Sequence, residues 1–428
     1  MNVLVFLIII LAFIIGIGIL NERFLHMQSD IALILFSLLI ALLIGVVSKF
    51  TPIPELNNFT QNIGEFGFEE YLMDGVLCFM LFAGASKVNM GKFKQNLRPI
   101  CLLALLTTAI SSFVYGLLFY AVAYLFQIPM DIWTCILLGC VVSPTDPIAA
   151  TGILSKIGLS KNVCSVIENE SLFNDGTGVT LFVFVRSVVI HSGESNFAVL
   201  MFREIVGAVA VALLVSFVLF RIIKLTKNSV SYILISLFDV AVVYMICEPL
   251  GFSGVIASVV CGMYFSYAMD KIDRRVSVID PKGYYKDFWE IIENILNAIL
   301  FVMIGLYVLD VEISSFAPVV IPAAILIILL SRIIGVYVSS VLSGRKIPGN
   351  YSLWEYVTLM VWSALKGGLS LALAIQTQSY LDPEVYKIFI NVTYVTIFFT
   401  VLAQGLSIKK VYFMLEKHKA QRLHQKRG

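Results

Sequence analysis

The chain has 428 residues, of which 59% are hydrophobic and only 14% are charged, and its formal net charge is +2. A soluble globular domain carries about 25% charged residues, so this composition excludes a water-soluble protein and indicates a chain that crosses a membrane many times. The seven cysteines include no Cys-x-x-Cys pair, so neither a zinc site nor a disulfide framework is predicted.

Apolar stretches long enough to cross a bilayer, which takes about 20 residues, recur along the whole chain. We therefore predict an all-α polytopic membrane protein with thirteen transmembrane helices. The expected spans are 2–20, 30–48, 69–86, 99–126, 131–155, 161–190, 197–223, 229–249, 252–269, 287–309, 315–343, 352–378 and 384–412. The first span has no basic segment before it and no Ala-x-Ala site, so we interpret it as retained in the membrane.

Lysine and arginine are distributed unevenly over the connections between these spans. One alternate set of connections, together with the C-terminal tail, holds 24 of the 30 residues, and the opposite set holds only Lys49 and Lys387. Positively charged loops stay in the cytoplasm, so we predict an N-terminus outside and a C-terminus inside. Residues 1–412 would form one transmembrane unit, and residues 413–428 a basic cytoplasmic tail.

The fifth span contains the segment Ser143-Pro144-Thr145-Asp146-Pro147. Each proline removes a helical hydrogen bond and disfavours helix at the residue before it, so we expect an extended segment between two half-helices. Irregular backbone at membrane depth is tolerated only where it is buried in protein or lines a cavity. A carboxylate at that depth costs about 2.5–3.5 kcal/mol on insertion scales. The segment therefore predicts a site for a cation or a proton.

The sixth span is unusually polar between residues 168 and 175. Glu168, Ser171 and Asp175 share one helix face, while Glu170 and Asn174 lie on a neighbouring face. Carboxylate, hydroxyl and carbonyl oxygens are ligands for hard cations, which favours a small alkali ion. The alternative is that these groups only hold helices together by hydrogen bonds. Two glycines beyond Asp175 remove bulk where another backbone could approach closely.

The twelfth span is interrupted in the same way, by Lys366 and the two glycines that follow it. Interrupted spans in corresponding positions of two halves are typical of inverted-repeat transporters, so spans 4–6 and 11–13 are expected to correspond. Arg332 in the eleventh span must pair with an acid or with half-helix carbonyls. The other acids, for which we expect structural pairing or an interfacial position, are Asp74, Asp239, Glu248, Glu290 and Glu293.

Taken together, these motifs resemble the sodium/proton antiporters of the NhaP type, in the cation:proton antiporter superfamily that also includes animal sodium/hydrogen exchangers. The resemblance covers most of the chain, and its most specific part is Thr-Asp-Pro followed by Asn-Asp in the next span. The matching segments are 143–147, 170–176, Glu248 with Ser253-Gly254, 297–305, Arg332 and 362–370.

The resemblance implies a core domain near 99–190 and 315–412 with two broken, crossing helices, and a homodimer formed by the remaining scaffold domain. It implies that Asp175 is the exchange carboxylate, with Lys366 and Arg332 as supporting charges. Asn174 stands where charge-translocating relatives carry a second aspartate. The implied ligands of Na⁺ are Asp175, Asp146, Ser171, Glu170 and Thr145, the last through its carbonyl.

The chain departs from the family pattern at two places. Lys366 stands where the family usually has arginine, and lysine, unlike arginine, can lose its proton when it is desolvated. The third span, around residues 77–84, lacks the proline pair and the acidic residue that the family often carries there.

We therefore predict a secondary antiporter, not an enzyme, in a prokaryotic plasma membrane. It would exchange Na⁺ (or Li⁺) for H⁺ by alternating access, electroneutrally and in the service of pH homeostasis, with no cofactor and no nucleic-acid partner. A K⁺/H⁺ exchanger of the same fold is the first alternative, because ligand distances select the cation. An intramembrane aspartyl protease is an alternative of another class, although its Tyr-Asp and Gly-x-Gly-Asp contexts are absent around Asp146 and Asp175.

Overall fold

The computed structural model describes residues 3–50, 75–190, 197–226, 228–271, 281–344 and 347–425, and these residues are almost entirely helical. The α-helices in chain order are α1 (Val3–Leu20), α2 (Ser29–Phe50), α5 (Leu77–Ser86), α6 (Met90–Cys101), α7 (Thr108–Leu125), α8 (Ile132–Val142), α9 (Ile148–Lys156), α10 (Lys161–Val189), α11 (Phe197–Ile223), α12 (Ser229–Cys247), α13 (Gly254–Met269), α14 (Pro281–Tyr307), α15 (Ala317–Ser343), α16 (Leu353–Trp362), α17 (Gly368–Gln376), α18 (Pro383–Phe398) and α19 (Gly405–Gln425). Two short π-helical segments, Leu102–Thr107 and Phe399–Gln404, join α6 to α7 and α18 to α19.

The helices confirm a polytopic membrane protein. Within the described residues, nine helical segments are long and apolar enough to cross a membrane, and shorter apolar helices are Leu77–Ser86, Ile132–Val142 and Gly254–Met269. Each expected span lies on one or more of these helices, except that the third begins outside the described residues. The count of thirteen stays a prediction. Helix α19 continues to Gln425, so the described part of the predicted tail is helical.

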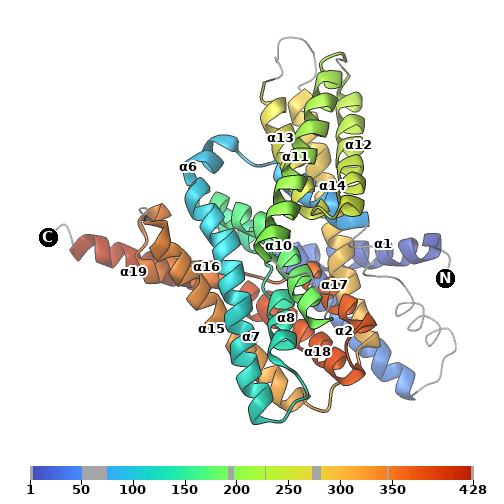
Figure 1. Ribbon diagram of the computed structural model, residues 1–428, viewed down its shortest axis with the longest axis vertical. Helices are drawn as coiled ribbons and strands as arrows, with labels where there is room; N and C mark the ends of the chain where they lie inside the picture. Colours follow the sequence, from blue (N-terminus) through green and yellow to red (C-terminus); the bar gives the residue numbers. More distant parts are fainter. Residues whose placement is uncertain are drawn as a thin grey trace.

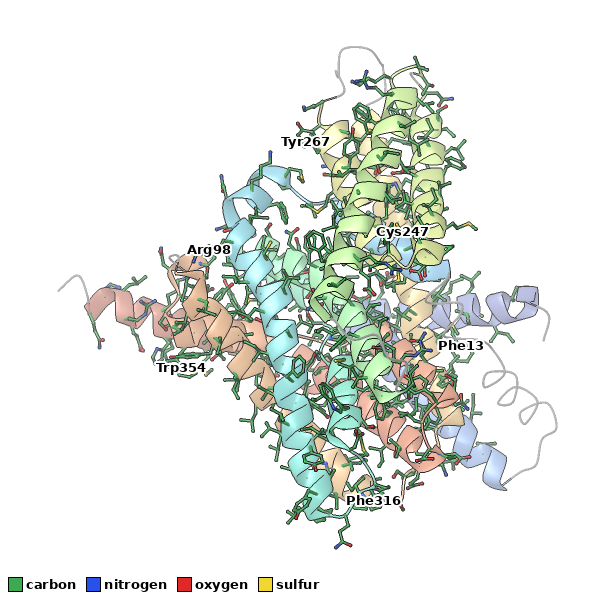
Figure 2. All side chains as sticks on the ribbon, viewed as in Figure 1. Phe13, Arg98, Cys247, Tyr267, Phe316 and Trp354 are labelled. Atoms are coloured by element: carbon green, nitrogen blue, oxygen red, sulfur yellow. The ribbon has the colours of Figure 1, made fainter. Side chains whose placement is uncertain are left out.

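The buried apolar side chains form two separate groups. The larger group joins helices such as α7, α8, α10, α15 and α18, and the smaller joins α11, α12 and α13 with parts of α5 and α14. We call α11–α13, α5 and the first half of α14 the scaffold helices. In Figure 1, α11, α12 and α13 stand side by side as a bundle at one end, and α7, α8, α15 and α18 lie toward the other. Figure 2 places Tyr267 near the free end of the scaffold bundle and Phe316 at the opposite end of the molecule.

Both predicted interruptions are present, and they lie against each other. Helix α8 ends at Val142 and α9 begins at Ile148, because Pro144 and Pro147 cannot continue the helical hydrogen bonds. Helix α16 ends at Trp362 and α17 begins at Gly368. The backbone N–H of Asp146 donates to the carbonyl of Leu365 at 2.8 Å, so the two broken helices cross at their interruptions.

Candidate ion site

The site begins with the unwound backbone at this crossing, where Lys366 is 2% exposed. Its ammonium donates to the carbonyl oxygen of Ser143 at 2.8 Å and to that of Pro144 at 3.1 Å. These carbonyls have no hydrogen-bond donor within the helix, because the prolines interrupt the helix beyond them. The Lys366 side chain therefore supplies buried donors to the end of the first broken helix.

The second broken helix is held by a residue that the sequence did not single out. The backbone N–H of Lys366 donates to the hydroxyl of Thr400 at 3.1 Å. Thr400 lies in the π-helical segment Phe399–Gln404, and its hydroxyl donates to the Thr396 carbonyl at 2.9 Å. A π-helical turn shifts the register of a helix and often occurs at functional sites. No local pattern in 399–404 indicates this turn, which explains why Thr400 was missed.

Behind the crossing, a network of neutral polar groups joins the broken helix to α10. The Thr145 hydroxyl lies 2.9 Å from the Ser171 hydroxyl. The Asn174 side chain accepts from the Thr145 backbone N–H at 3.2 Å and donates to the Thr145 hydroxyl at 2.6 Å. All three residues are at most 2% exposed. Asn174 thus uses both ends of its amide to fix Thr145, which an ionised aspartate could not do because it lacks a donor.

The network ends in a buried ion pair. An Nη atom of Arg332 donates to the Glu170 carboxylate at 2.9 Å, and the same oxygen accepts from Asn174 at 3.2 Å. Both charged residues are nearly inaccessible, at 4% and 1% exposure. The prediction that Arg332 must pair with an acid or with carbonyls is confirmed, and the partner is Glu170 in α10. With one oxygen engaged by Arg332, Glu170 holds α15 to α10; its role as a ligand of Na⁺ stays a prediction.

Asp146 and Asp175 differ from these buried residues because both reach a large cavity of about 1160 Å³. Both residues are only partly buried, and Asp175 lies within electrostatic range of Asp146, Glu170 and Lys366. One oxygen of Asp146 accepts from the Ile148 backbone N–H at 2.9 Å and so caps α9. Of the predicted ligands, the structure therefore brings Asp146, Asp175 and Thr145 to the cavity wall, whereas Ser171 and Glu170 lie behind it.

Charged side chains surround the wider part of the cavity. Its acids include Asp30, Glu168, Glu290 and Glu293, and its bases are Lys87, Lys92, Lys156 and Lys161. Lys87 at the end of α5 forms an ion pair with Glu293 of α14. The structural pairing that the sequence predicts for Glu293 is thus confirmed, whereas Asp74 lies outside the described residues. These charged side chains therefore line the same cavity as the two carboxylates.

Glycines let neighbouring elements approach α10 beside Asp175. A Cβ atom at Gly178 would overlap the ring of Pro144, and one at Gly176 would lie 2.6 Å from the side chain of Ile256 in α13. At Gly367, a Cβ would lie 2.9 Å from that of Asp146. A side chain at Gly176 or Gly178 would have to displace α13 or the broken helix from α10, and one at Gly367 would have to displace Asp146.

The fold and this site define an ion-exchanging membrane transporter, and the sequence comparison gives its family. The model for "Sodium/hydrogen exchanger, transmembrane" matches residues 57–414, so the chain belongs to the sodium/hydrogen exchanger family.

Among its relatives, the Na⁺/H⁺ antiporter NhaP of Pseudomonas aeruginosa is 32% identical, over 91% of both chains. The Na⁺/H⁺ antiporter NhaH of Halobacillus aidingensis is 27% identical over 86% of this chain and 89% of its own. The sodium proton antiporter MjNhaP1 of Methanocaldococcus jannaschii, solved at pH 8, superposes with a TM-score of 0.77 at 19% identity. That match covers 96% of this chain and 98% of the other, and it confirms the fold.

Proposed function

We propose that this protein exchanges Na⁺ for H⁺ across the membrane, and that the carboxylate of Asp175 binds the two ions alternately. The observation that carries the proposal is the position of Asp175: it lies beside the crossing of two broken helices and reaches a large cavity. Intramembrane carboxylates at such crossings are the usual means of coordinating ions in secondary transporters. Membership of the sodium/hydrogen exchanger family supports the choice of ions.

We assign the neighbouring groups two kinds of role. Asp146 and Thr145 share the cavity wall with Asp175, and we propose that they complete the Na⁺ site with hard oxygen ligands. Ser171, Asn174 and Glu170 keep these ligands in place through the hydrogen bonds to Thr145 and the ion pair to Arg332. Ser171 and Glu170 would reach the ion only if the network rearranges.

The cavity also suggests which side of the membrane the site faces in this conformation. The cavity is lined by Lys87, Lys92, Lys156 and Lys161, and the positive-inside pattern assigns the loops that hold them to the cytoplasm. We propose that this is the inward-facing conformation of an alternating-access cycle. The scaffold helices would then provide the surface for a homodimer, as the resemblance implies.

The proposal is tested with purified protein in liposomes that enclose a pH-sensitive dye. A pulse of external Na⁺ should make the interior alkaline, because Na⁺ enters as H⁺ leaves. Protons and Na⁺ compete for one carboxylate, so the Na⁺ concentration that gives half the maximal rate should rise as the pH falls, and high Na⁺ should restore the rate. Pulses of Li⁺ and K⁺ are given in parallel. A response to K⁺ alone would establish the K⁺/H⁺ exchanger, and no response to any cation would reject antiport.

Exchange is expected to be insensitive to membrane potential. If Asp175 returns either with one proton or with one Na⁺, the protein carries the same net charge in both directions, and Asn174 adds no titrating group. The rate in liposomes should therefore not change when a potassium gradient with valinomycin imposes a potential of either sign. Acceleration with one sign and slowing with the other would contradict electroneutral exchange and would point to a second titrating group, with Lys366 as the first to examine.

A further inference from the structure

Outside the exchange site, the scaffold helices contain an acid with an unusual environment. Asp239 lies near the middle of α12 and is 0% exposed, which leaves structural pairing, and not an interfacial position, of the two expectations for this acid. Apolar side chains of the smaller buried group surround it, among them Val240 and Ala212. Asp239 lies deep in an apolar helix bundle, where an isolated carboxylate is very costly. Its charge state therefore depends on whether its neighbours can compensate a negative charge.

The hydrogen bonds around Asp239 do not support an ionised carboxylate. One oxygen lies 2.7 Å from the hydroxyl of Ser216 in α11, which also lies 3.2 Å from the thiol of Cys261 in α13. The other oxygen, Oδ1, is buried and has no hydrogen-bond partner among the described residues. A carboxylate can accept about four hydrogen bonds, whereas the donors within reach of this one are the Ser216 hydroxyl and the weakly donating Cys261 thiol.

No positive charge compensates this acid either. Asp239 forms no salt bridge with any lysine, arginine or histidine in the described part of the chain. The titratable groups that face it from the packed helices are Cys261 and Tyr264 of α13 and Tyr285 of α14, with Ser216 as the polar contact from α11. Each of these groups is uncharged at neutral pH in its ordinary state, so none neutralises a negative charge.

We propose that Asp239 is a second proton-binding site of this protein, occupied in the folded state and separate from the exchange site. As a neutral acid, the Asp239 O–H donates to the Ser216 hydroxyl, and the Ser216 hydrogen is then free to point at the Cys261 sulfur. The bound proton joins α11, α12 and α13 through one chain of hydrogen bonds. Helix α13 carries Ile256, which packs against α10 at Gly176, next to Asp175. The neutral acid thus stabilises the helix that backs the exchange site.

The site is tested by thermal unfolding of the purified full-length protein between weakly acidic and alkaline pH. An acid that is neutral in the folded protein but ionised in the unfolded chain makes the folded state lose stability as the pH rises. Asp239→Asn keeps the shape and removes the titration. The equilibrium constant for folding of Asp239→Asn, divided by that of wild type, should therefore increase with pH, up to about tenfold per pH unit for one proton. The control is Asp382→Asn, an exposed aspartate in a loop before α18, which should follow wild type.

A second measurement depends neither on whether Asp239→Asn folds nor on transport activity. Difference infrared spectroscopy of wild type should show the carbonyl stretch of a protonated carboxylic acid at neutral pH. Ser216→Ala should shift this band, because it removes the hydrogen-bond partner of the acid, whereas Asp382→Asn should leave it in place. Equal pH dependence of stability in wild type and Asp239→Asn, or a protonated-acid band that ignores Ser216→Ala, would overturn the proposal.

Discussion

Replacing Asp175 with asparagine is expected to reduce exchange to the level of protein-free liposomes. The substitution keeps the size of the side chain but removes the one group that can bind a proton and Na⁺ in turn. Asp175 reaches the cavity rather than an ion pair, so the loss of its charge leaves no buried cation without a partner and the protein should still fold. The measurement is the dye response to a Na⁺ pulse, made on protein that elutes and melts like wild type.

Two controls define the specificity of this result. Asp146→Asn should also impair exchange severely, because Asp146 shares the cavity wall and caps α9. Asp382→Asn, which is exposed and outside the cavity, should leave exchange as in wild type. A normal Na⁺ response from well-folded Asp175→Asn would exclude the proposed mechanism.

Replacing Lys366 with methionine is expected to have the largest effect on stability. Methionine fills much the same space but leaves the carbonyls of Ser143 and Pro144 without their buried donor. Leaving a buried acceptor without its donor costs about 1–3 kcal/mol for each group, so the midpoint of thermal unfolding should fall markedly. The measurement is a thermal unfolding curve of the purified variant, followed by exchange assays on any folded fraction.

Lys366→Arg is the matched comparison, because arginine is the residue usual in the family and keeps the positive charge. It should fold, although the planar guanidinium would donate to the two carbonyls with a different geometry from that of the lysine ammonium. If the methionine variant melts at the same temperature as wild type, Lys366 does not stabilise the crossing of the broken helices.

The local parts of this architecture were predictable from the sequence because their causes are local. Pro144 and Pro147 lack the N–H groups that a helix needs, so the break between α8 and α9 follows from the residues themselves. The length of the apolar stretches likewise predicts the helices.

The pairing of distant residues was not predictable in the same way. The sequence required Arg332 to have a partner but left acids and carbonyls open, and only the ion pair formed in the folded structure identifies Glu170. The interior position of Asp239 depends on how α12 is rotated against α11 and α13. A single acid within an evenly apolar helix gives no periodic signal of that rotation. Thr400 depends on a π-helical register shift that its own segment does not reveal.

The two glycines of α10 have one more consequence. Successive helical residues are rotated by about 100°, so Gly176 and Gly178 point in nearly opposite directions, roughly 200° apart. Gly176 faces Ile256 of the scaffold helices, and Gly178 faces Pro144 of the broken helix. Around the helix axis, the direction of Asp175 lies between these two directions. A Cβ at Gly176 would lie 2.6 Å from the Ile256 side chain, so any larger residue there would have to displace α13 or its side chain next to the carboxylate. The distance between α13 and the exchange carboxylate therefore depends on the absence of a side chain at Gly176.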